Sequence, residues 1–290
     1  MIRDEVFEEH RPLLFSIAYR MLGSVMDAED AVQEAFVRWR RAGEVRSPKA
    51  YLTSVVTRLC IDHLRSARAR REEYAGPWLP EPLVVEPAAD PAVLDETLSM
   101  AFLVLLESLS PVERAVFLLR EVFDYDYAEI SKIVGKSEAN CRQIARRARQ
   151  SVAARRPRFD PAPEDGERLV RRFVEACMSG DMEGLLRMMS EEITLWTDGG
   201  GRVRAARNPI YGSDRVARFL LGVTVRAPEG LVVRFVRVNG QPGFISYHAD
   251  GSPQGAAVFD ISSGGRIAAI RLVVNPEKLR SIPPLGEVER

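Results

Sequence analysis

Residues 127–154 read YAEISKIVGKSEANCRQIARRARQSVAA and predict two short helices joined by a tight turn. Apolar residues recur at helical spacing from Ile130 to Val134, and Gly135 ends this first helix. Ser137 is a residue type that caps helices, so we expect a second helix to begin directly after it. A helical pair of this kind is typical of a helix-turn-helix unit.

The second helix has one apolar face and one face of basic and amide side chains. Eight Lys or Arg and one acidic residue lie between Lys136 and Arg158, although the whole chain is balanced at 41 basic and 41 acidic residues. A solvated helix face is one explanation, but Asn and Gln beside Arg are able to read base edges, which favours DNA binding. We expect Ser137 and Arg147 to contact phosphates, and Asn140, Arg142, Gln143 and Arg146 to make base or register contacts. Arg149 completes the predicted DNA-binding set.

Length and composition allow two or three domains, because the chain has 290 residues of which 46% are hydrophobic. No apolar run is long enough to span a membrane, and the N-terminus MIRDEVFEEHR is too charged for a signal peptide, so we expect a cytoplasmic protein. The three cysteines and three histidines are scattered. Their spacing predicts neither a disulfide nor a metal site, and no cofactor is expected.

Residues 5–71 predict helices throughout. An apolar stripe ends at Gly23, Asp27 is expected to cap a second helix, and a third helix opens after Pro48. The second helix carries acidic and amide residues on one face, and the third runs into the arginine-rich segment RSARARREE. The pattern predicts a compact helical domain with one acidic and one basic surface.

These strings carry a resemblance to a known family. DAEDAVQEAFVRWRR (27–41), followed by YLTSVVTRLCIDHLRSARARRE (51–72), resembles region 2 of bacterial sigma factors of the extracytoplasmic-function class. Residues 97–154 resemble region 4 of the same family. The resemblance implies two partners, core RNA polymerase and promoter DNA.

The resemblance also implies which residues meet each partner. Many members have Asn where Arg58 stands, so no particular −10 sequence is carried over. Taken alone, Asp30 and Glu34 favour an ordinary solvated face, and the order of the motifs reverses that interpretation. The clamp helices of the polymerase largest subunit would meet Asp27, Asp30, Gln33 and Glu34. The −10 element would meet Arg58, Asp62, Arg65 and Arg68, and the basic helix described above would read the −35 element.

A proline-rich stretch, AGPWLPEPLVVEPAADP (75–91), joins the two helical parts and predicts an extended connector. Trp78 and Leu79 are large apolar residues here, and they either tuck against the nearest helix or dock into another domain of the chain. A helix is expected near Leu94 to Glu107. The sequence Ser110-Pro111-Val112-Glu113 then predicts a capping box at the start of the next helix.

After a second linker the pattern changes. Helices are expected near 169–177, 182–189 and 214–223, and a strand at 193–201 runs into a glycine turn. Alternating segments then predict successive antiparallel strands at 231–238, 243–249, 255–261 and 266–274. Helices followed by a curved sheet indicate an α+β cone.

Residues 165–280 resemble the SnoaL-like, ketosteroid-isomerase-like fold. The strings WLPEP, DGGGR and NPEKL occur together in the sigma factors that carry this domain as an extension, which implies regulation of polymerase engagement in cis and no dedicated anti-sigma partner. On this hypothesis the extension clasps the linker, with Trp78 as the anchor beside Asp198 and Arg202. The interdomain residues would be Trp78, Leu79, Pro80, Glu81, Pro82, Asp198, Gly199, Gly200, Gly201, Arg202, Asn275, Pro276, Glu277, Lys278 and Leu279.

The extension also raises the question of catalysis, because it contains side chains that could act as a catalytic acid or base: Asp198, Tyr247, His248 and Asp260. Asp198 precedes three glycines and is expected to cap a turn, while Tyr247 and His248 face opposite ways on a strand. We therefore predict no catalytic residues, and leave open a small-molecule ligand in the pocket. The rival interpretation is a helix-turn-helix regulator with a ligand-binding or enzymatic tail.

The expected fold is thus multidomain: all-α sigma regions 2 and 4, then an α+β SnoaL-like domain, in a chain expected to be monomeric. The expected divisions are region 2 at 1–74, the linker at 75–96, region 4 at 97–156, a second linker at 157–166 and the regulatory domain at 167–290.

Overall fold

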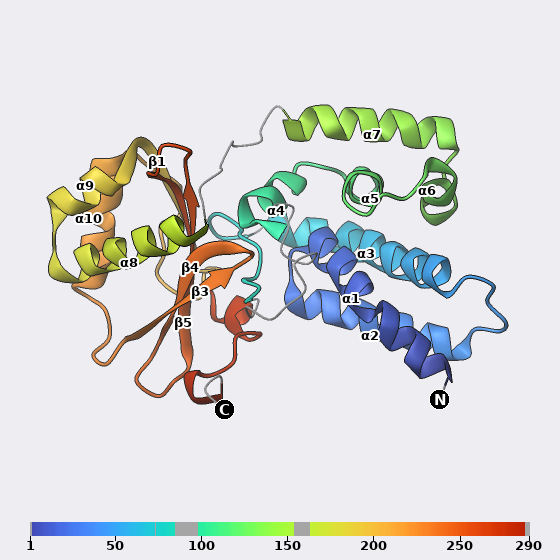
Figure 1. Cartoon of the computed structure of the whole chain (residues 1–290), viewed down its shortest axis with the longest axis horizontal. Helices are drawn as coiled ribbons and strands as arrows, with labels where there is room; N and C mark the ends of the chain where they lie inside the picture. Colours follow the sequence, from blue (N-terminus) through green and yellow to red (C-terminus); the bar gives the residue numbers. More distant parts are fainter. Residues whose placement is uncertain (1, 73, 85–97, 154–162, 288–290) are drawn as a thin grey trace. The chain divides into compact units, whose positions relative to one another are not determined.

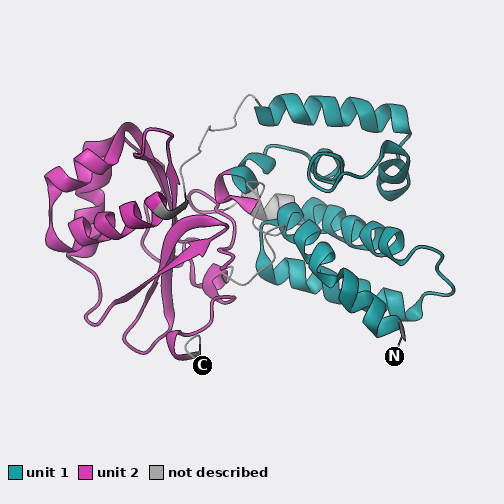
Figure 2. Cartoon of the chain, in the orientation of Figure 1, with its two compact units in different colours: residues 1–73, 102–156 teal, residues 74–101, 157–290 magenta. Residues whose placement is uncertain are grey.

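The computed structural model describes residues 2–72, 74–84, 98–153 and 163–287. The chain forms two compact units, Met1–Glu73 with Phe102–Arg156 and Tyr74–Ala101 with Pro157–Arg290 (Figure 2). We call these unit 1 and unit 2. The described part of the proline-rich segment therefore belongs with the C-terminal domain.

Unit 1 is entirely helical (Figure 1). None of the helices that the structure describes is both long and apolar enough to cross a membrane. The expected order of helices is confirmed, although the described part of the first region 4 helix begins at Met100, later than expected. The helices are α1 (Ile2–Leu22), α2 (Val25–Arg41), α3 (Pro48–Glu72), α4 (Met100–Leu106), α5 (Pro111–Glu121), α6 (Tyr127–Val134) and α7 (Glu138–Ala153).

The start of α2 differs from the sequence prediction. Gly23 ends α1 with φ of 67°, a conformation that glycine adopts without strain. Ser24 is then the N-cap residue, and its Oγ accepts the Asp27 N–H at 3.1 Å. The expectation that Asp27 caps this helix was wrong, because a serine stands directly after the chain reversal.

The predicted capping residues of region 4 are confirmed. Ser110 and Glu113 form a reciprocal capping box at the start of α5, and the Ser110 hydrogen bonds lower the pKa of the Glu113 carboxyl. Gly135 ends α6 with φ of 66°. Ser137 then accepts the Asn140 N–H at 3.3 Å and starts α7.

Unit 2 packs helices against one six-stranded sheet. Its helices are α8 (Pro163–Ser179), α9 (Met182–Met188) and α10 (Ser213–Thr224), with 3-10 turns η3 (Pro276–Leu279) and η4 (Leu285–Glu287). Its strands are β1 (Met189–Asp198), β2 (Ile210–Tyr211), β3 (Val232–Val238), β4 (Gln241–Tyr247), β5 (Pro253–Ile261) and β6 (Ile267–Val273).

The sheet has the order β2-β1-β6-β5-β4-β3. Strands β3 to β6 are successive antiparallel neighbours, as the alternating segments predicted. Strand β1 instead pairs with β6 in parallel, so the first long strand lies beside the last one. The predicted α+β architecture of this part of the chain is confirmed.

The two faces of the sheet have different coverings. Ile193 and Leu195 of β1 point into the apolar core formed with the helices, together with Phe173 and Phe259. Because side chains alternate along a strand, the neighbouring Asp198 points to the other face. There Asp198 meets Leu79 of the 74–84 segment and Lys278 of η3.

Candidate nucleic-acid interface and linker-binding site

The exposed face of α7 carries three side chains that are free to bind a ligand. Asn140, Gln143 and Arg146 are exposed, and within the described part of the chain none of them has a side-chain hydrogen bond or ion pair. Cys141 and Ile144, on the opposite face of the helix, are buried. The sequence pattern of one packed and one polar face is confirmed.

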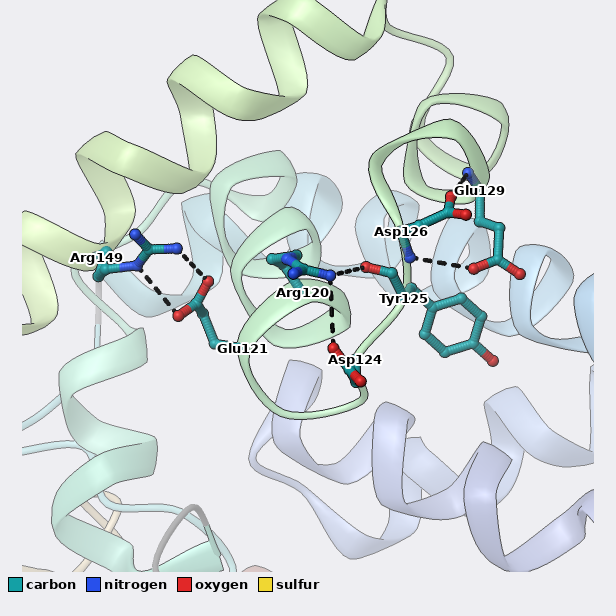
Figure 3. A network of polar contacts seen from close by, with 7 residues as sticks. All are labelled: Arg120, Glu121, Asp124, Tyr125, Asp126, Glu129 and Arg149. Carbon is teal, nitrogen blue, oxygen red and sulfur yellow. Dashed lines mark hydrogen bonds and ion pairs between the residues drawn. The ribbon is translucent and has the colours of Figure 1, made fainter.

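The other predicted residues of α7 are placed differently. Arg142 pairs with Glu138 at 2.9 Å, and Arg147 is exposed. Arg149 makes a bidentate pair with Glu121 of α5, at 2.7 and 3.1 Å, which raises the pKa of Arg149 (Figure 3). Arg149 therefore braces α7 against α5, and a DNA contact from it stays a prediction.

The turn between α5 and α6 is held by its own polar network (Figure 3). Arg120 donates to the Tyr125 carbonyl at 3.0 Å and approaches the Asp124 carboxylate at 3.5 Å. Asp126 and Glu129 form a second capping box, which starts α6. These contacts fix the helix before the turn and, through it, the entry of the predicted reader helix.

The acidic surface of α2 is accessible. Asp30, Gln33 and Glu34 are exposed, and Glu34 pairs with Arg38 on the same helix at 2.8 Å. Asp27 is half-buried and lies 3.5 Å from the His63 ring. The four predicted polymerase-binding residues thus lie on one helix, and three of them face solvent.

The predicted −10 residues on α3 do not share one environment. Arg58 donates to the carbonyls of Ile133 and Lys132 at the end of α6, at 2.9 and 2.7 Å. Asp62 and Arg65 pair only loosely with each other, at 3.3 Å. Arg68 lies on α3, but its side chain is outside the described part of the structure.

Asp198, the last residue of β1, is the centre of the linker-binding site. Its side chain is fully buried. One carboxylate oxygen accepts the Leu79 N–H at 2.8 Å and pairs with Lys278 Nζ at 2.7 Å. The other accepts the Tyr74 hydroxyl at 2.6 Å and the Gly200 N–H at 3.0 Å. Donors from the linker, the glycine turn and the C-terminal turn therefore converge on one carboxylate.

Lys278 closes this site from the C-terminal side. Its Nζ lies 4.2 Å from the Trp78 ring centroid and 4.9 Å from that of Tyr74, and it also donates to the Leu79 carbonyl. Cation–π contacts strengthen when the cation is desolvated, as it is here. Burial and then the hydrogen bond to Asp198 raise the pKa of the Tyr74 phenol, so its hydroxyl stays protonated and donates.

The glycine turn and the NPEKL string meet each other beside this carboxylate. A Cβ at Gly200 would lie 2.2 Å from the Asn275 amide nitrogen. The φ of Gly200 is also 58°, a conformation that favours glycine, so only glycine fits at this position. The Asn275 amide donates to the Tyr74 hydroxyl at 3.0 Å. At Gly200 the close approach is thus made by a C-terminal side chain, whereas a Cβ at Gly201 would lie 3.1 Å from the Cβ of Ala75 in the linker.

Other members of the predicted interdomain set are also placed. Leu79, Pro80, Glu81 and Pro82 are buried, and the described linker residues form no strand beyond a single bridge between Val84 and Val238. Arg202 pairs with Glu277 on the exposed side of the turn, at 3.0 Å. Gly199 and Gly201 complete the turn, and Pro276 and Leu279 lie in η3.

Two linker-holding residues escaped the sequence analysis, Asn239 and Gln241. Asn239 exchanges backbone and side-chain hydrogen bonds with Leu83, at 2.8 and 3.1 Å, and its amide donates to the Leu98 carbonyl at 3.1 Å. The side-chain Oε1 of Gln241 accepts the N–H of Met100, the first residue of α4, at 3.0 Å. The Asn-Gly pair predicts a hairpin turn, but no neighbouring residue indicates that Asn239 also binds the linker.

Two of the four acid or base candidates in the extension, Asp198 and Asp260, are engaged in structural contacts. Asp198 and Asp260 form buried ion pairs with Lys278 and Arg271. Gln241 donates to the other Asp260 oxygen at 2.5 Å. Among the described residues, no group of three or more His, Cys, Asp or Glu is arranged to hold a metal ion.

Replacing Asn239 with glycine is expected to free the linker without breaking the hairpin, because glycine accepts the φ of 54° at this position. The side-chain clamp on Leu83 and Leu98 would be lost, at about 1–3 kcal/mol for the buried polar groups left unpaired. Amide hydrogen exchange in residues 79–84 should accelerate by about tenfold or more. Ser262→Gly, in the hairpin between β5 and β6, is the matched control, and equal acceleration in both variants would contradict the clamp.

Comparison with known proteins identifies relatives over nearly the whole chain. Residues 6–70 match the family Sigma-70 region 2, and residues 99–152 match Sigma-70, region 4. The chain is 38% identical to the ECF RNA polymerase sigma factor SigJ of Mycobacterium tuberculosis (strain ATCC 25618 / H37Rv), over 96% of this chain and 93% of the relative. It is 33% identical to the probable ECF RNA polymerase sigma factor SigI of M. tuberculosis (strain CDC 1551 / Oshkosh), over 93% and 92%.

The structural comparison agrees with the sequences. The crystal structure of the M. tuberculosis extracytoplasmic function sigma factor SigJ matches with a TM-score of 0.76 and 34% identity, over 94% of this chain and 96% of that one. Sigma factors are not enzymes; they bind core RNA polymerase and promoter DNA to direct transcription initiation. With helical regions 2 and 4 followed by an α+β domain, the chain belongs to the extracytoplasmic-function family of RNA polymerase sigma factors.

Proposed function

We propose that the C-terminal domain regulates this sigma factor in cis by holding the linker between regions 2 and 4. The observation that carries the proposal is the Asp198 carboxylate, which binds Leu79 and Tyr74 of the linker and Lys278 of the C-terminal turn in one buried site. Asn239 and Gln241 add contacts on both sides of residues 85–97. An attached domain that already holds the linker takes the place of a separate anti-sigma factor.

The test is run-off transcription with purified core polymerase and a library of promoter sequences. The full chain is compared with a variant carrying Trp78→Ala and Asp198→Ala, and domain contacts are followed by hydrogen exchange. We expect promoter-specific transcripts from the full chain and a changed yield from the variant, whose direction gives the sign of control. Unchanged yield and unchanged exchange in residues 74–84 would reject regulation through the linker.

We further propose that α7 reads the −35 element with Asn140, Gln143 and Arg146, and that the Arg147 and Ser137 side chains contact phosphates. Three adjacent polar side chains are exposed near the N-terminal half of the second helix of a helix-turn-helix, which is the part that reaches base edges in such units. The bracing of Arg149 by Glu121 supports a fixed docking angle for the helix.

Gln143→Ala is expected to weaken binding to the selected −35 sequence by about 5- to 150-fold, because a good base contact contributes about 1–3 kcal/mol of discrimination. Binding to unrelated DNA should change little. Gln150→Ala is the matched control, since Gln150 is an exposed amide on the same helix two turns later. Fluorescence anisotropy at fixed salt measures both, and an equal loss on specific and unrelated DNA would contradict base reading.

We propose that polymerase docks on α2 through Asp30, Gln33 and Glu34, with Asp27 at the edge of the surface. The exposure of the acidic and amide side chains on one helix supports this placement. On α3, the −10 element would meet Arg58, Asp62, Arg65 and Arg68.

A small-molecule ligand of the extension remains a separate proposal, tested by a shift in melting temperature across a metabolite panel.

A further inference from the structure

The hydroxyl of Tyr247 is a buried polar group without a partner. Tyr247 is the last residue of β4 and is fully buried. Within the part of the chain that the structure describes, no atom completes a hydrogen bond with this hydroxyl. A buried tyrosine hydroxyl usually finds a partner, and leaving it unpaired costs stability. The hydroxyl is therefore available to a group that the chain itself does not supply.

Tyr247 faces away from the apolar core that the helices of unit 2 cover. Phe235 of β3 and Phe244 of β4 lie opposite each other and pack against that core. Because side chains alternate along a strand, Arg234 of β3 and Tyr247 of β4 both point to the other face of the sheet. The hydroxyl and the guanidinium thus belong to one surface, which is separate from the interior of the cone.

Four side chains form a square on this face. Arg234 lies opposite Ile245, and Val232 lies opposite Tyr247. The polar pair therefore occupies one diagonal of the square and the apolar pair the other. Diagonal neighbours on paired strands are within reach of each other when their side chains are long or aromatic.

The guanidinium of Arg234 has no acidic partner among the described residues. Arg234 is half-buried on β3, the last strand of the sheet. The other arginine of this strand, Arg237, pairs with Glu167 at 3.0 Å. Asp260 points to the same face as Arg234, but it pairs with Arg271. A partly desolvated guanidinium without a carboxylate favours the binding of an anion.

The two polar groups can act on one ligand. Burial raises the pKa of the Tyr247 phenol, and the neighbouring charge of Arg234 opposes that rise. The phenol therefore stays protonated at neutral pH and can donate its proton to a hydrogen bond. An ordered water would satisfy the hydroxyl but would leave the charge of Arg234 without a counterion. A ligand that satisfies both groups accepts hydrogen bonds and is negatively charged.

We propose that Arg234 and Tyr247 bind the carboxylate of a small organic acid, whose apolar part contacts Val232. A carboxylate carries one negative charge, which one guanidinium balances, whereas a phosphate monoester carries about 1.5 to 2 at pH 7. Val232 is an apolar side chain that is 42% exposed beside this pair, and an apolar group would cover it. The site does not depend on the proposed hold of the C-terminal domain on the linker.

The test is isothermal titration calorimetry of the full chain with sodium butyrate, sodium acetate and sodium phosphate, at pH 7 and constant ionic strength. Butyrate should bind at one saturable site and about threefold or more tightly than acetate, because its two additional CH₂ groups leave water. Phosphate should bind more weakly than butyrate. No saturable butyrate binding, equal binding of butyrate and acetate, or tightest binding of phosphate would overturn the proposal.

Two substitutions each remove one side of the site. Tyr247→Phe deletes only the hydroxyl, and Arg234→Gln deletes the charge. Each should weaken butyrate binding by about tenfold or more, because hydrogen bonds to charged groups are strong. Arg266→Gln, in the turn between β5 and β6, is the matched control, since Arg266 is an exposed arginine of the same unit. Unchanged binding in both test variants, or an equal loss in the control, would reject the site.

The melting temperature without any added acid gives an independent test. Tyr247→Phe should raise the melting temperature of the full chain by about 2–4 °C, because the variant no longer buries an unpaired hydroxyl. At a butyrate concentration 100 times its Kd, the unmodified chain should gain about 5 °C or more, and Tyr247→Phe should gain less. A lower melting temperature for Tyr247→Phe without butyrate would show that the hydroxyl is paired within the fold, and would overturn the proposal.

Discussion

Replacing Asp198 with alanine is expected to lower the free energy of unfolding of unit 2 by about 3–5 kcal/mol, the range observed when one partner of a buried ion pair is removed. The loss is large because Lys278, whose side chain is 8% exposed, would lose its carboxylate partner in a buried site. The Leu79 N–H and the Tyr74 hydroxyl would also lose their acceptor. Urea unfolding, followed by tryptophan fluorescence to which Trp78 and Trp196 of unit 2 contribute, measures the change.

The matched control for Asp198 is the second ion pair between the same two segments. Arg202 and Glu277 also join the glycine turn to the C-terminal turn, but their side chains are 66% and 51% exposed. Exposed pairs contribute about 0–1 kcal/mol, so Arg202→Ala should change stability little. If the two variants lost similar amounts of stability, the buried carboxylate would not be the centre of the site.

The same contrast extends to the linker. Asp198→Ala should expose the amides of residues 79–84 to hydrogen exchange, since Leu79 donates directly to the carboxylate. Arg202→Ala should leave this exchange unchanged. A stability loss in Asp198→Ala without faster exchange in the linker would show that the carboxylate holds unit 2 together but does not hold the segment that regulation requires.

Structural features that depend on residues close together in the sequence could be predicted from the sequence. The helix-turn-helix follows from the apolar spacing around Ile130, the break at Gly135 and the cap at Ser137, and all of these signals act within one or two helical turns. The strands β3 to β6 follow from alternation and from the Asn-Gly turn at residue 239. In each case a local physical cause fixes a local structure.

Partners separated by long stretches of chain could not be predicted from such signals. Lys278 and Leu79 are 199 residues apart, and Arg58 and Ile133 are 75 apart. Motif strings placed WLPEP, DGGGR and NPEKL together through a family resemblance, but they did not pair Trp78 with Lys278. The clamp by Asn239 and the parallel pairing of β1 with β6 likewise depend on tertiary packing. Such packing produces no periodic pattern of residue types in the sequence.

Reversing two charges on α2, with Asp30→Lys and Glu34→Lys, is expected to reduce affinity for core polymerase by about 100-fold or more. Like charges brought together at an interface cost several kcal/mol, and each 1.4 kcal/mol is a factor of ten in affinity. The fold should survive, because both side chains are exposed and the only described pair that is lost, Glu34 with Arg38, contributes about 0.3–0.5 kcal/mol.

A control with the same change of net charge separates docking from general electrostatics. Glu191 and Glu192 are exposed on β1 in unit 2, so Glu191→Lys with Glu192→Lys adds the same positive charge away from α2. Pulldown and anisotropy with core polymerase at two salt concentrations should show the loss only for the α2 variant, because long-range attraction is screened while a docked contact is not. An equal loss in both variants would mean that net charge governs binding, and it would contradict the docking of polymerase on α2.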